Sequence, residues 1–406
     1  MEGLHDGELR VLRGPRLARW RGQGRQDREG HAVRRVAAAP GRELSGLSAA
    51  LPDFPWDLLE PAKARAAAHP DGVVDLSVGT PVDPVPPLIR RALADASDSP
   101  GYPLTAGTPA LRAAIAQWLV RECGASGTPD VLPTIGSKEL VAWLPTLLGV
   151  GPGDTVVIPA IGYPTYEVGV RLAGAKVIRS DALTAVGPDP SVRLVWINSP
   201  SNPTGKVLPV EHLRKVVAWA RERGAVVVSD ECYLSLGWET KPVSVLDDAV
   251  TGGDYTGVLA VHSLSKRSNL AGYRAGFVGG DPALIGELLA VRKHGGMIVP
   301  APVQAAMIAA LGDEEHVAAQ RAVYARRRDE LRVALTKAGF EISHSEAGLY
   351  LWSTRGEDSW KTVDWLAERG ILAAPGAFYG PAAEQHVRIA LTATDERVAA
   401  AVARLA

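Results

Sequence analysis

The sequence has little of what marks disulfide-rich, metal-binding or membrane-spanning proteins. Only two of its 406 residues are cysteines, Cys123 and Cys232, and their separation matches no disulfide framework and no metal-ligand pattern. No apolar run approaches the length needed to cross a bilayer, and the start shows no basic segment leading into an apolar one. We therefore expect a cytoplasmic protein without a metal site and without membrane contact.

An excess of charge of either sign is also lacking. The 44 basic and 45 acidic side chains give a net charge of −1, which predicts no strong attraction to nucleic acid. Hydrophobic residues make up 46% of the chain and charged residues 22%, as in soluble globular proteins. A chain of 406 residues exceeds one core of usual size, so we expect a larger and a smaller domain.

Residues 1–45 differ from the rest of the chain. They contain ten arginines, no lysine and few large apolar residues, which is too little apolar surface to fold alone. We interpret them as a disordered extension, or as the product of a start site upstream of a natural one near Leu44 to Leu47. The arginines form no helical face, which argues against a nucleic-acid-binding arm, and the segment is too short for a helix-turn-helix module.

The pattern assigns residues 83–312 to the larger domain and residues 46–82 with 313–406 to the smaller one. In the larger domain, short β-branched segments alternate with helical segments, which predicts an α/β fold with a largely parallel sheet. Its expected strands are 155–158, 176–179, 194–198, 225–229 and 258–262, with helices at 109–120 and from 137. The smaller domain has an α+β pattern, with a helix over 58–66, a strand at 73–78, an arginine-rich helix over 320–335, a strand pair between 340 and 352, and a last strand at 387–391.

Polar side chains follow three of the expected parallel strands. Asn202, Asp230 and Lys266 each come just after a strand, and the carboxyl ends of parallel strands meet at one edge of the sheet. We expect these residues to contact a ligand there.

Lys266 stands out because lysine is scarce, with ten in the chain against 34 arginines. A lone lysine at a strand end is usually a solvated surface charge. A positively charged cofactor site can instead lower its pKa and free the amine for imine formation. Arg274, eight residues later and flanked by Gly272 and Gly276, suits bidentate phosphate binding at a close backbone approach.

These segments resemble fold-type I, class I/II aminotransferases, whose motifs occur here in the same order from about residue 50 to the end. The Schiff-base motif is Ser263-Leu-Ser265-Lys266 followed by Gly-Tyr-Arg274-Ala-Gly. The resemblance implies a large domain with a mostly parallel central sheet, a smaller α+β domain and pyridoxal 5'-phosphate as cofactor. It also implies that Lys266 forms the Schiff base and moves a proton, while Ser263, Ser265 and Arg274 bind the phosphate.

Two further motifs supply implied contacts to the cofactor ring. Asn202 lies in Asn198-Ser-Pro-Ser-Asn202-Pro-Thr-Gly, which alone is also typical of an ordinary turn, and the resemblance implies contacts to the phenolic oxygen and the substrate carboxylate. In Ser229-Asp-Glu-Cys-Tyr233, Asp230 would pair with the ring nitrogen and Tyr233 would bond the phenolic oxygen. A cationic ring serves as an electron sink. Glu231 and Cys232 are interpreted as structural.

Five more residues are implied to bind the cofactor. Gly136, Ser137 and Lys138 open an expected helix, where free N–H groups favour a phosphate, although Lys138 also fits a surface position. Tyr163 would stack on the pyridine ring. Tyr102 would reach the phosphate of the neighbouring subunit, which implies a homodimer with shared active sites.

The implied substrate contacts come from Arg388 and Gly79. Arg388, in His-Val-Arg388-Ile-Ala, would hold the substrate α-carboxylate, a planar task that suits arginine better than lysine. Without this resemblance, an arginine in an edge strand would be interpreted as a surface residue. Gly79, in Leu-Ser-Val-Gly79-Thr-Pro, would line the same pocket.

The segments 51–57, 76–84 and 292–302 resemble actinobacterial succinyldiaminopimelate aminotransferases of lysine and diaminopimelate synthesis. This resemblance implies transfer between N-succinyl-L,L-diaminopimelate and 2-oxoglutarate. Arg292, Lys293 or Lys138 would bind the extra carboxylates, although each also fits a surface charge. The alternatives are an aspartate, aromatic or L,L-diaminopimelate aminotransferase, a carbon–sulfur lyase or decarboxylase of the same fold, and a non-enzymatic regulator.

Overall fold

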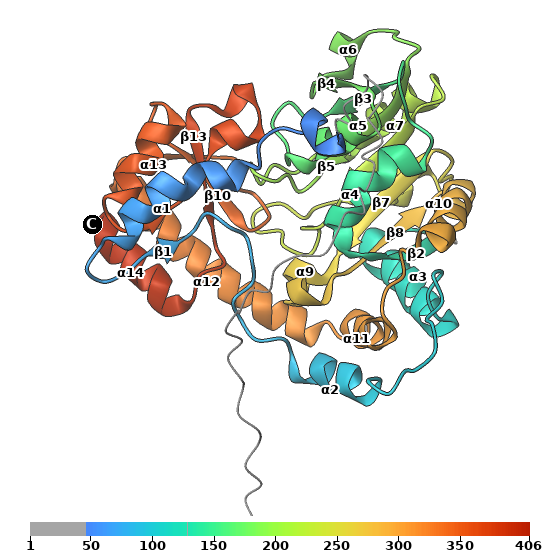
Figure 1. The fold of residues 1–406 in the computed structure, drawn as a ribbon, viewed down its shortest axis with the longest axis horizontal. Helices are drawn as coiled ribbons and strands as arrows, with labels where there is room; N and C mark the ends of the chain where they lie inside the picture. Colours follow the sequence, from blue (N-terminus) through green and yellow to red (C-terminus); the bar gives the residue numbers. More distant parts are fainter. Residues whose placement is uncertain (1–45, 128) are drawn as a thin grey trace, which may run out of the picture. The chain divides into compact units, whose positions relative to one another are not determined.

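The computed structural model describes residues 46–127 and 129–406, so the interpretation of residues 1–45 lies outside the described residues. A seven-stranded sheet forms the centre of the larger domain, with strand order β2-β8-β7-β6-β5-β3-β4 (Figure 1). Neighbouring strands from β4 to β7 are parallel, and β8 is antiparallel to both of its neighbours. The strands are β2 (Asp130–Ile135), β3 (Thr155–Ile158), β4 (Lys176–Arg179), β5 (Val192–Asn198), β6 (Val226–Asp230), β7 (Val258–Ser263) and β8 (Ala275–Gly280).

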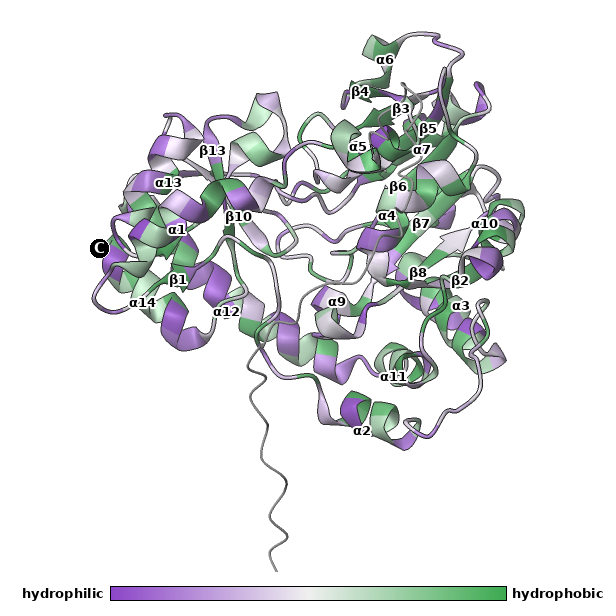
Figure 2. Cartoon of the chain, viewed as in Figure 1, coloured by the Kyte–Doolittle hydropathy of each residue, from purple (hydrophilic) through white to green (hydrophobic). Residues whose placement is uncertain are grey.

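Helices cover both faces of this sheet, which explains why its strands are apolar almost throughout. On β5, Leu194 and Trp196 join one core cluster, while Val195 and Ile197 join the other. Figure 2 shows the hydrophobic strands between helices with mixed surfaces. One face carries α4 (Gly136–Leu147), α5 (Thr165–Leu172) and α10 (Pro282–Gly295), and the other carries α2 (Pro87–Asp95), α3 (Pro109–Cys123), α7 (Val210–Arg221) and α11 (Ala301–Leu311).

The five strands expected in the larger domain are confirmed, but β2 and β8 were not anticipated. Pro133 lies in β2 and glycines occupy three positions of β8, and both residue types argue against a strand in a sequence. Pro133 is tolerated because β2 is at the edge of the sheet. Gly276 is needed because an added Cβ would lie 3.0 Å from the carbonyl carbon of Gly136 and from the carbonyl oxygen of His262.

The smaller domain packs helices around a four-stranded antiparallel sheet with the order β12-β13-β10-β9. A separate parallel pair joins β1 to β11, so a segment near residue 75 is paired with one near residue 371. The expected strand at 73–78 is only two residues long, because the Asp75 carboxylate accepts from the Ser77 N–H and hydroxyl and turns the chain. The elements are α1 (Glu60–Ala67), β1 (Val74–Asp75), α12 (Glu315–Lys337), β9 (Glu341–Ser343), β10 (Tyr350–Thr354), α13 (Ser359–Ala367), β11 (Ile371–Leu372), β12 (Ala374–Pro375), β13 (His386–Ala390) and α14 (Asp395–Leu405).

Short helical turns make the remaining connections. The α-helical turns are α6 (Leu183–Val186), α8 (Asp248–Thr251) and α9 (Leu264–Arg267), and the 3-10 turns are η1 (Leu47–Ala50), η2 (Pro55–Leu59), η3 (Ala271–Tyr273), η4 (Gly376–Tyr379) and η5 (Pro381–Ala383). No helix in residues 46–127 and 129–406 is long and apolar enough to cross a membrane.

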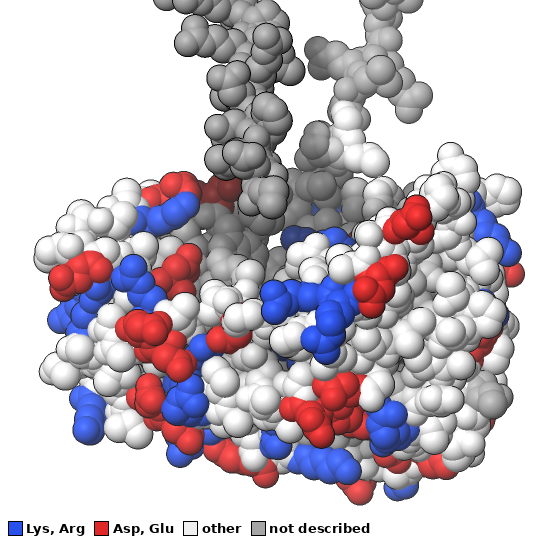
Figure 3. Space-filling model, turned by 90° about the horizontal axis from the view of Figure 1, so that it is seen from below, with Lys and Arg blue, Asp and Glu red and all other residues white. Residues whose placement is uncertain are grey.

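Charged side chains of both signs are intermingled on the face shown in Figure 3. Part of the arginine excess of α12 is used internally rather than on the surface. Arg327 is buried, and its guanidinium donates to both carboxylate oxygens of Asp83 at 2.7 and 2.8 Å and to Asp395 at 2.7 Å. This arginine therefore ties the chain after β1 to α12 and α14.

Candidate active site

A cavity of about 700 Å³ opens at the carboxyl ends of β5, β6 and β7, where the sequence predicts ligand contacts. Side chains of both domains line it, and it contains all but two of the predicted site residues. Those two are Gly136, which lies behind its wall, and Tyr102, whose side chain is fully exposed elsewhere. The predicted residues that line it are Gly79, Ser137, Lys138, Tyr163, Asn202, Asp230, Tyr233, Ser263, Ser265, Lys266, Arg274 and Arg388.

Lys266 lies in α9, the single helical turn that follows β7. The Ser263 hydroxyl accepts from the Ser265 N–H at 3.2 Å and caps this turn, which fixes the direction of the next side chain. The Lys266 amine donates to the carbonyl of Gly79 from the smaller domain. Burial lowers the pKa of Lys266, so a larger fraction of its amine is neutral and nucleophilic than in a surface lysine.

Asp230 is the last residue of β6 and is buried without a cation. Its carboxylate accepts from the Tyr166 hydroxyl at 2.8 Å and from the Cys232 N–H at 3.2 Å. No Lys, Arg or His of the described residues lies within ion-pair distance of it, and burial raises the pKa of Asp230. A buried carboxylate in this setting fits a ligand that brings its own positive charge.

An anion cradle forms where α4 begins. Gly136 has a φ of +71°, and a Cβ there would collide with the guanidinium of Arg274. Arg274 donates to the Ala271 carbonyl at 2.9 Å and has no acidic partner in the described part of the chain. The free N–H groups of the α4 terminus and this guanidinium converge near the hydroxyls of Ser263 and Ser265, a donor set that fits a phosphate.

Arg388 points from β13 into the opposite side of the cavity and is 2% exposed. It donates to the Asn202 side-chain oxygen at 3.0 Å and to the Ser77 carbonyl at 2.6 Å, and no carboxylate of the described residues pairs with it. Asn202 is held in turn by Asn198, whose side-chain oxygen accepts from the Asn202 N–H at 2.7 Å. A buried guanidinium held only by neutral acceptors is ready for a carboxylate from a ligand.

Two tyrosines near the cavity were missed by sequence reasoning. Tyr350 lies 3.1 Å from Tyr233 between the hydroxyl oxygens, and the guanidinium of Arg388 lies 4.0 Å from its ring centre. A Cβ on Gly79 would meet the Tyr350 ring at 2.8 Å, which explains the glycine. Tyr166 orients Asp230. Tyr166 belongs to the same motif as Tyr163, so the sequence could have indicated it. Tyr350 lies in no motif, so no sequence pattern indicated its position.

Of the three cations considered for distal carboxylates, only Lys138 reaches the cavity. Partial burial and then the nearby Arg274 lower the pKa of Lys138. The suggestion of Arg292 was wrong, because Arg292 is fully buried and forms two 3.1 Å contacts with Glu139. Lys293 is exposed on α10 and does not line the cavity.

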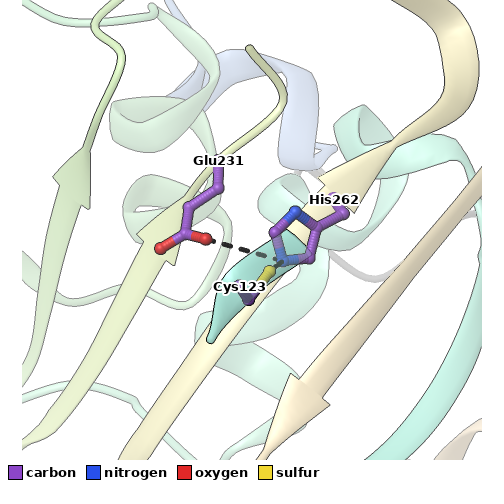
Figure 4. A group of neighbouring side chains, drawn as sticks. All are labelled: Cys123, Glu231 and His262. Atoms are coloured by element: carbon purple, nitrogen blue, oxygen red, sulfur yellow. Dashed lines mark hydrogen bonds and ion pairs between the residues drawn. The ribbon is translucent and has the colours of Figure 1, made fainter. Parts of the chain in front are cut away.

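Behind the cavity, Cys123, Glu231 and His262 form a buried cluster (Figure 4). The His262 Nε2 atom lies 3.5 Å from Glu231 Oε2 and 3.8 Å from the Cys123 sulfur. Burial, and then Arg267, lower the pKa of His262 to about 3, and burial raises that of Glu231 to about 7. A neutral imidazole therefore faces a carboxyl group that holds a proton up to neutral pH. Spacing arguments could not find this cluster, because its members come from α3, the residue after β6, and β7.

The comparisons with known proteins agree with this geometry. Residues 71–405 match the family model described as aminotransferase class I and II. The chain belongs to this family.

The similar proteins whose activities are named are all aminotransferases. The chain is 62% identical over 419 aligned residues to a probable aminotransferase of Mycobacterium tuberculosis, with all of both chains covered. It is 63% identical to the 4-dedimethylamino-4-oxo-anhydrotetracycline transaminase OxyQ of Streptomyces rimosus, with 87% of this chain and 99% of that one covered. The solved structure of a probable N-succinyldiaminopimelate aminotransferase of Thermus thermophilus superposes with a TM-score of 0.79 and 29% identity, over 87% and 99% of the two chains. The protein is a pyridoxal-phosphate-dependent aminotransferase.

Proposed function

We propose that the enzyme transfers the amino group between N-succinyl-L,L-diaminopimelate and 2-oxoglutarate, in the synthesis of diaminopimelate and lysine. The observation that carries the proposal is a pair of cations, Arg388 and Lys138, that line one cavity without a carboxylate partner among the described residues. Two such groups suit substrates with two or more carboxylates. The likeness to the probable N-succinyldiaminopimelate aminotransferase of Thermus thermophilus supports this choice.

The proposed cofactor contacts follow from the donor set of the cavity. Lys266 would attach pyridoxal phosphate, Asp230 would pair with the ring nitrogen, and Tyr163 would stack on the ring. Tyr233 and Asn202 would hydrogen-bond the phenolic oxygen. The phosphate would lie against Gly136, Ser137, Ser263, Ser265 and Arg274, which leaves the Lys138 amine for a distal substrate carboxylate, and Tyr102 would reach the phosphate from the other subunit of a homodimer.

The protein's part in the reaction is positioning and proton transfer. When bound, pyridoxal phosphate supplies an electron sink for the charge that develops at the substrate's α-carbon. Arg388 and Asn202 hold the α-carboxylate, with Gly79 forming the adjacent wall, so that the α-proton faces the Lys266 Nζ atom. The Lys266 amine removes that proton, and its lowered pKa matches this task. Glutamate donates the amino group and leaves as 2-oxoglutarate before the second substrate enters, which makes the kinetics ping-pong.

The test has two parts. The purified enzyme should show a near-visible absorption band that glutamate bleaches, and Lys266→Ala should lose the band and turnover. Turnover should then be compared for succinyldiaminopimelate, L,L-diaminopimelate, aspartate and aromatic amino donors, each with 2-oxoglutarate. A kcat/KM for succinyldiaminopimelate below that of aspartate or of the aromatic donors would overturn the substrate assignment.

A second candidate substrate comes from the 63% identical relative, which by its name aminates a ketone of an anhydrotetracycline. The aromatic side chains of Phe54 and Trp56 in the cavity wall favour this possibility. The same assay should therefore include a fused-ring ketone as amino acceptor with glutamate as donor. Faster turnover of that ketone than of the succinylated oxo acid would favour the second candidate.

A further inference from the structure

Two aromatic residues of the cavity wall take no part in the proposed contacts to the cofactor and to the substrate α-carboxylate. Phe54 and Trp56 are called here the aromatic strap; Phe54 directly precedes η2 and Trp56 is the second residue of η2, in the smaller domain. Both line the cavity, and Phe54 is 53% exposed. An exposed large aromatic side chain beside a ligand cavity suits contact with a ligand.

The strap is held by an aromatic series that leads into the core of the smaller domain. The Phe54 and Trp56 rings are 5.7 Å apart between centroids, and Trp56 lies 5.6 Å from Phe378. Phe378 in turn lies 5.7 Å from Trp360, which does not line the cavity. Trp56 is therefore anchored by packing, and Phe54 forms the free end of the series.

The strap also lies between Lys138 and Arg388, neither of which has a carboxylate partner in the described part of the chain. The Lys138 Nζ atom is 5.5 Å from the Phe54 ring centre, and the guanidinium carbon of Arg388 is 6.0 Å from the Trp56 ring centre. Both distances are within the range of cation–π attraction. An apolar surface with a carboxylate-binding group at each end matches a ligand that has an apolar chain with a carboxylate at each end.

We propose that the aromatic strap selects substrates by the length of their side chain. The selected class consists of amino acids in which a run of methylene groups separates the reacting α-carbon from a distal carboxylate. The methylenes pack on Trp56 and Phe54 while the carboxylates bind Arg388 and Lys138. This inference rests on the proposed function and specifies which part of the cavity sets its substrate range.

The expected signature is a dependence on chain length. Burial of one methylene contributes about a fourfold change in kcat/KM. Along the series aspartate, glutamate, 2-aminoadipate and 2-aminopimelate, the wild-type kcat/KM should rise by about this factor per step until the distal carboxylate reaches Lys138. Trp56→Ala should flatten the series and lower the value for 2-aminopimelate about tenfold or more, with aspartate changed by less than about threefold.

A binding measurement separates this inference from the proposed function. Succinate, glutarate, adipate and pimelate are unreactive, and their dissociation constants can be read from the absorption band of the bound cofactor. These constants should follow the same order with chain length and lose it in Trp56→Ala. Trp360→Ala is the matched control, because Trp360 packs on the same Phe378 but lies outside the cavity.

Three results would overturn the inference. One is a wild-type series without dependence on chain length, and another is an equal loss for aspartate and 2-aminopimelate in Trp56→Ala. The third is a Trp360→Ala variant that flattens the series as much as Trp56→Ala does. An enzyme that binds the dicarboxylates by length but does not aminate succinylated substrates would contradict the proposed function and leave the strap in place.

Discussion

Several charged side chains at this site are buried or cavity-facing and have no oppositely charged partner in residues 46–127 and 129–406. Asp230 has no cation and Arg388 has no carboxylate among the described residues, although each is more than nine-tenths buried. A buried charged side chain without a partner of opposite charge destabilises the folded protein by roughly several kcal/mol. The protein holds them with neutral hydrogen bonds, so that a bound cofactor and substrate supply the missing charges.

Tyr166 should have a measurable part in this arrangement. Its hydroxyl donates to Asp230, which favours the charged carboxylate, so Tyr166→Phe should raise the pKa of Asp230 further. A hydrogen bond to a charged group contributes about 1.5–3 kcal/mol, so we expect at least about tenfold weaker pyridoxal phosphate binding, measured by equilibrium dialysis. Tyr255→Phe, which removes a hydroxyl that accepts from Gly127 outside the cavity, is the control. Unchanged cofactor affinity in Tyr166→Phe would contradict this role.

Glu231 gives a stability prediction with a defined pH dependence. Its pKa rises from 4.5 to about 7 in the folded protein, so the folded state keeps a proton that the unfolded state loses between these values. The free energy of unfolding should therefore fall as the pH rises through this window. Glu231→Gln removes the charge and keeps the shape, so it should be more stable than the wild type at about pH 8 by on the order of 3 kcal/mol.

At about pH 4 the two proteins should unfold nearly alike, because Glu231 is then largely protonated in both the folded and the unfolded wild type. Urea denaturation at both pH values measures the difference. An equal gain at both would show that the effect does not come from ionisation.

Sequence reasoning found most of the site residues that lie in contiguous motifs, with Tyr166 as an exception, and missed those that lie in no motif. Lys266, Asp230 and Arg388 were predicted, and the structure brings them to one cavity. Tyr350 was missed because its position depends on the pairing of β10 with β13, which only the fold determines. The Cys123 cluster was missed for the same reason, since its members are far apart in sequence.

At the scale of elements, β8 shows how a strand can be shaped around the cofactor site. Gly276 allows β8 to lie against the turn that opens α4, so Gly276→Ala should displace Gly136 and Ser137. We expect at least about tenfold weaker cofactor binding and a loss of about 1–3 kcal/mol in the free energy of unfolding. Dialysis and thermal unfolding of the cofactor-free protein measure the two effects.

The control for this substitution is Gly286→Ala in α10. An added Cβ at Gly286 meets no atom within 4 Å, and alanine favours a helix by about 0.5–1 kcal/mol. This variant should bind the cofactor normally and be slightly more stable. Equal cofactor affinity in the Gly276→Ala and Gly286→Ala variants would refute the close-approach argument.

Strands whose residues favour a strand locally were predicted well, and strands that depend on tertiary contacts were not. β3 and β4 were predicted to the residue because β-branched runs end there at turns. β1 was predicted too long, because Asp75 bonds its own neighbours and ends the pairing. β2 and β8 were missed because proline and glycine oppose strand formation locally and are accepted only for reasons of the tertiary structure.

At the scale of the whole molecule, Tyr102 gives a test of the proposed homodimer. Its side chain is fully exposed and lies outside the cavity of its own chain. If it completes the site of a second copy, a Lys266→Ala chain and a Tyr102→Ala chain should complement each other when dissociated, mixed and reassembled. Random pairing with two sites per dimer predicts recovery of about a quarter of the wild-type activity. No recovery, or a monomeric mass by light scattering, would contradict the shared site.

The pairing of Val74 with Ile371 has a consequence for how the chain is made. All strands of the central sheet lie between residues 130 and 280, so the cofactor-binding half can form while the ribosome is still translating. The partner of β1 emerges almost 300 residues after β1 itself, followed by Phe378 and Arg388. The N-terminal segment must therefore wait, unpaired, until synthesis is nearly complete. Substrate selection is the last property that the nascent enzyme acquires.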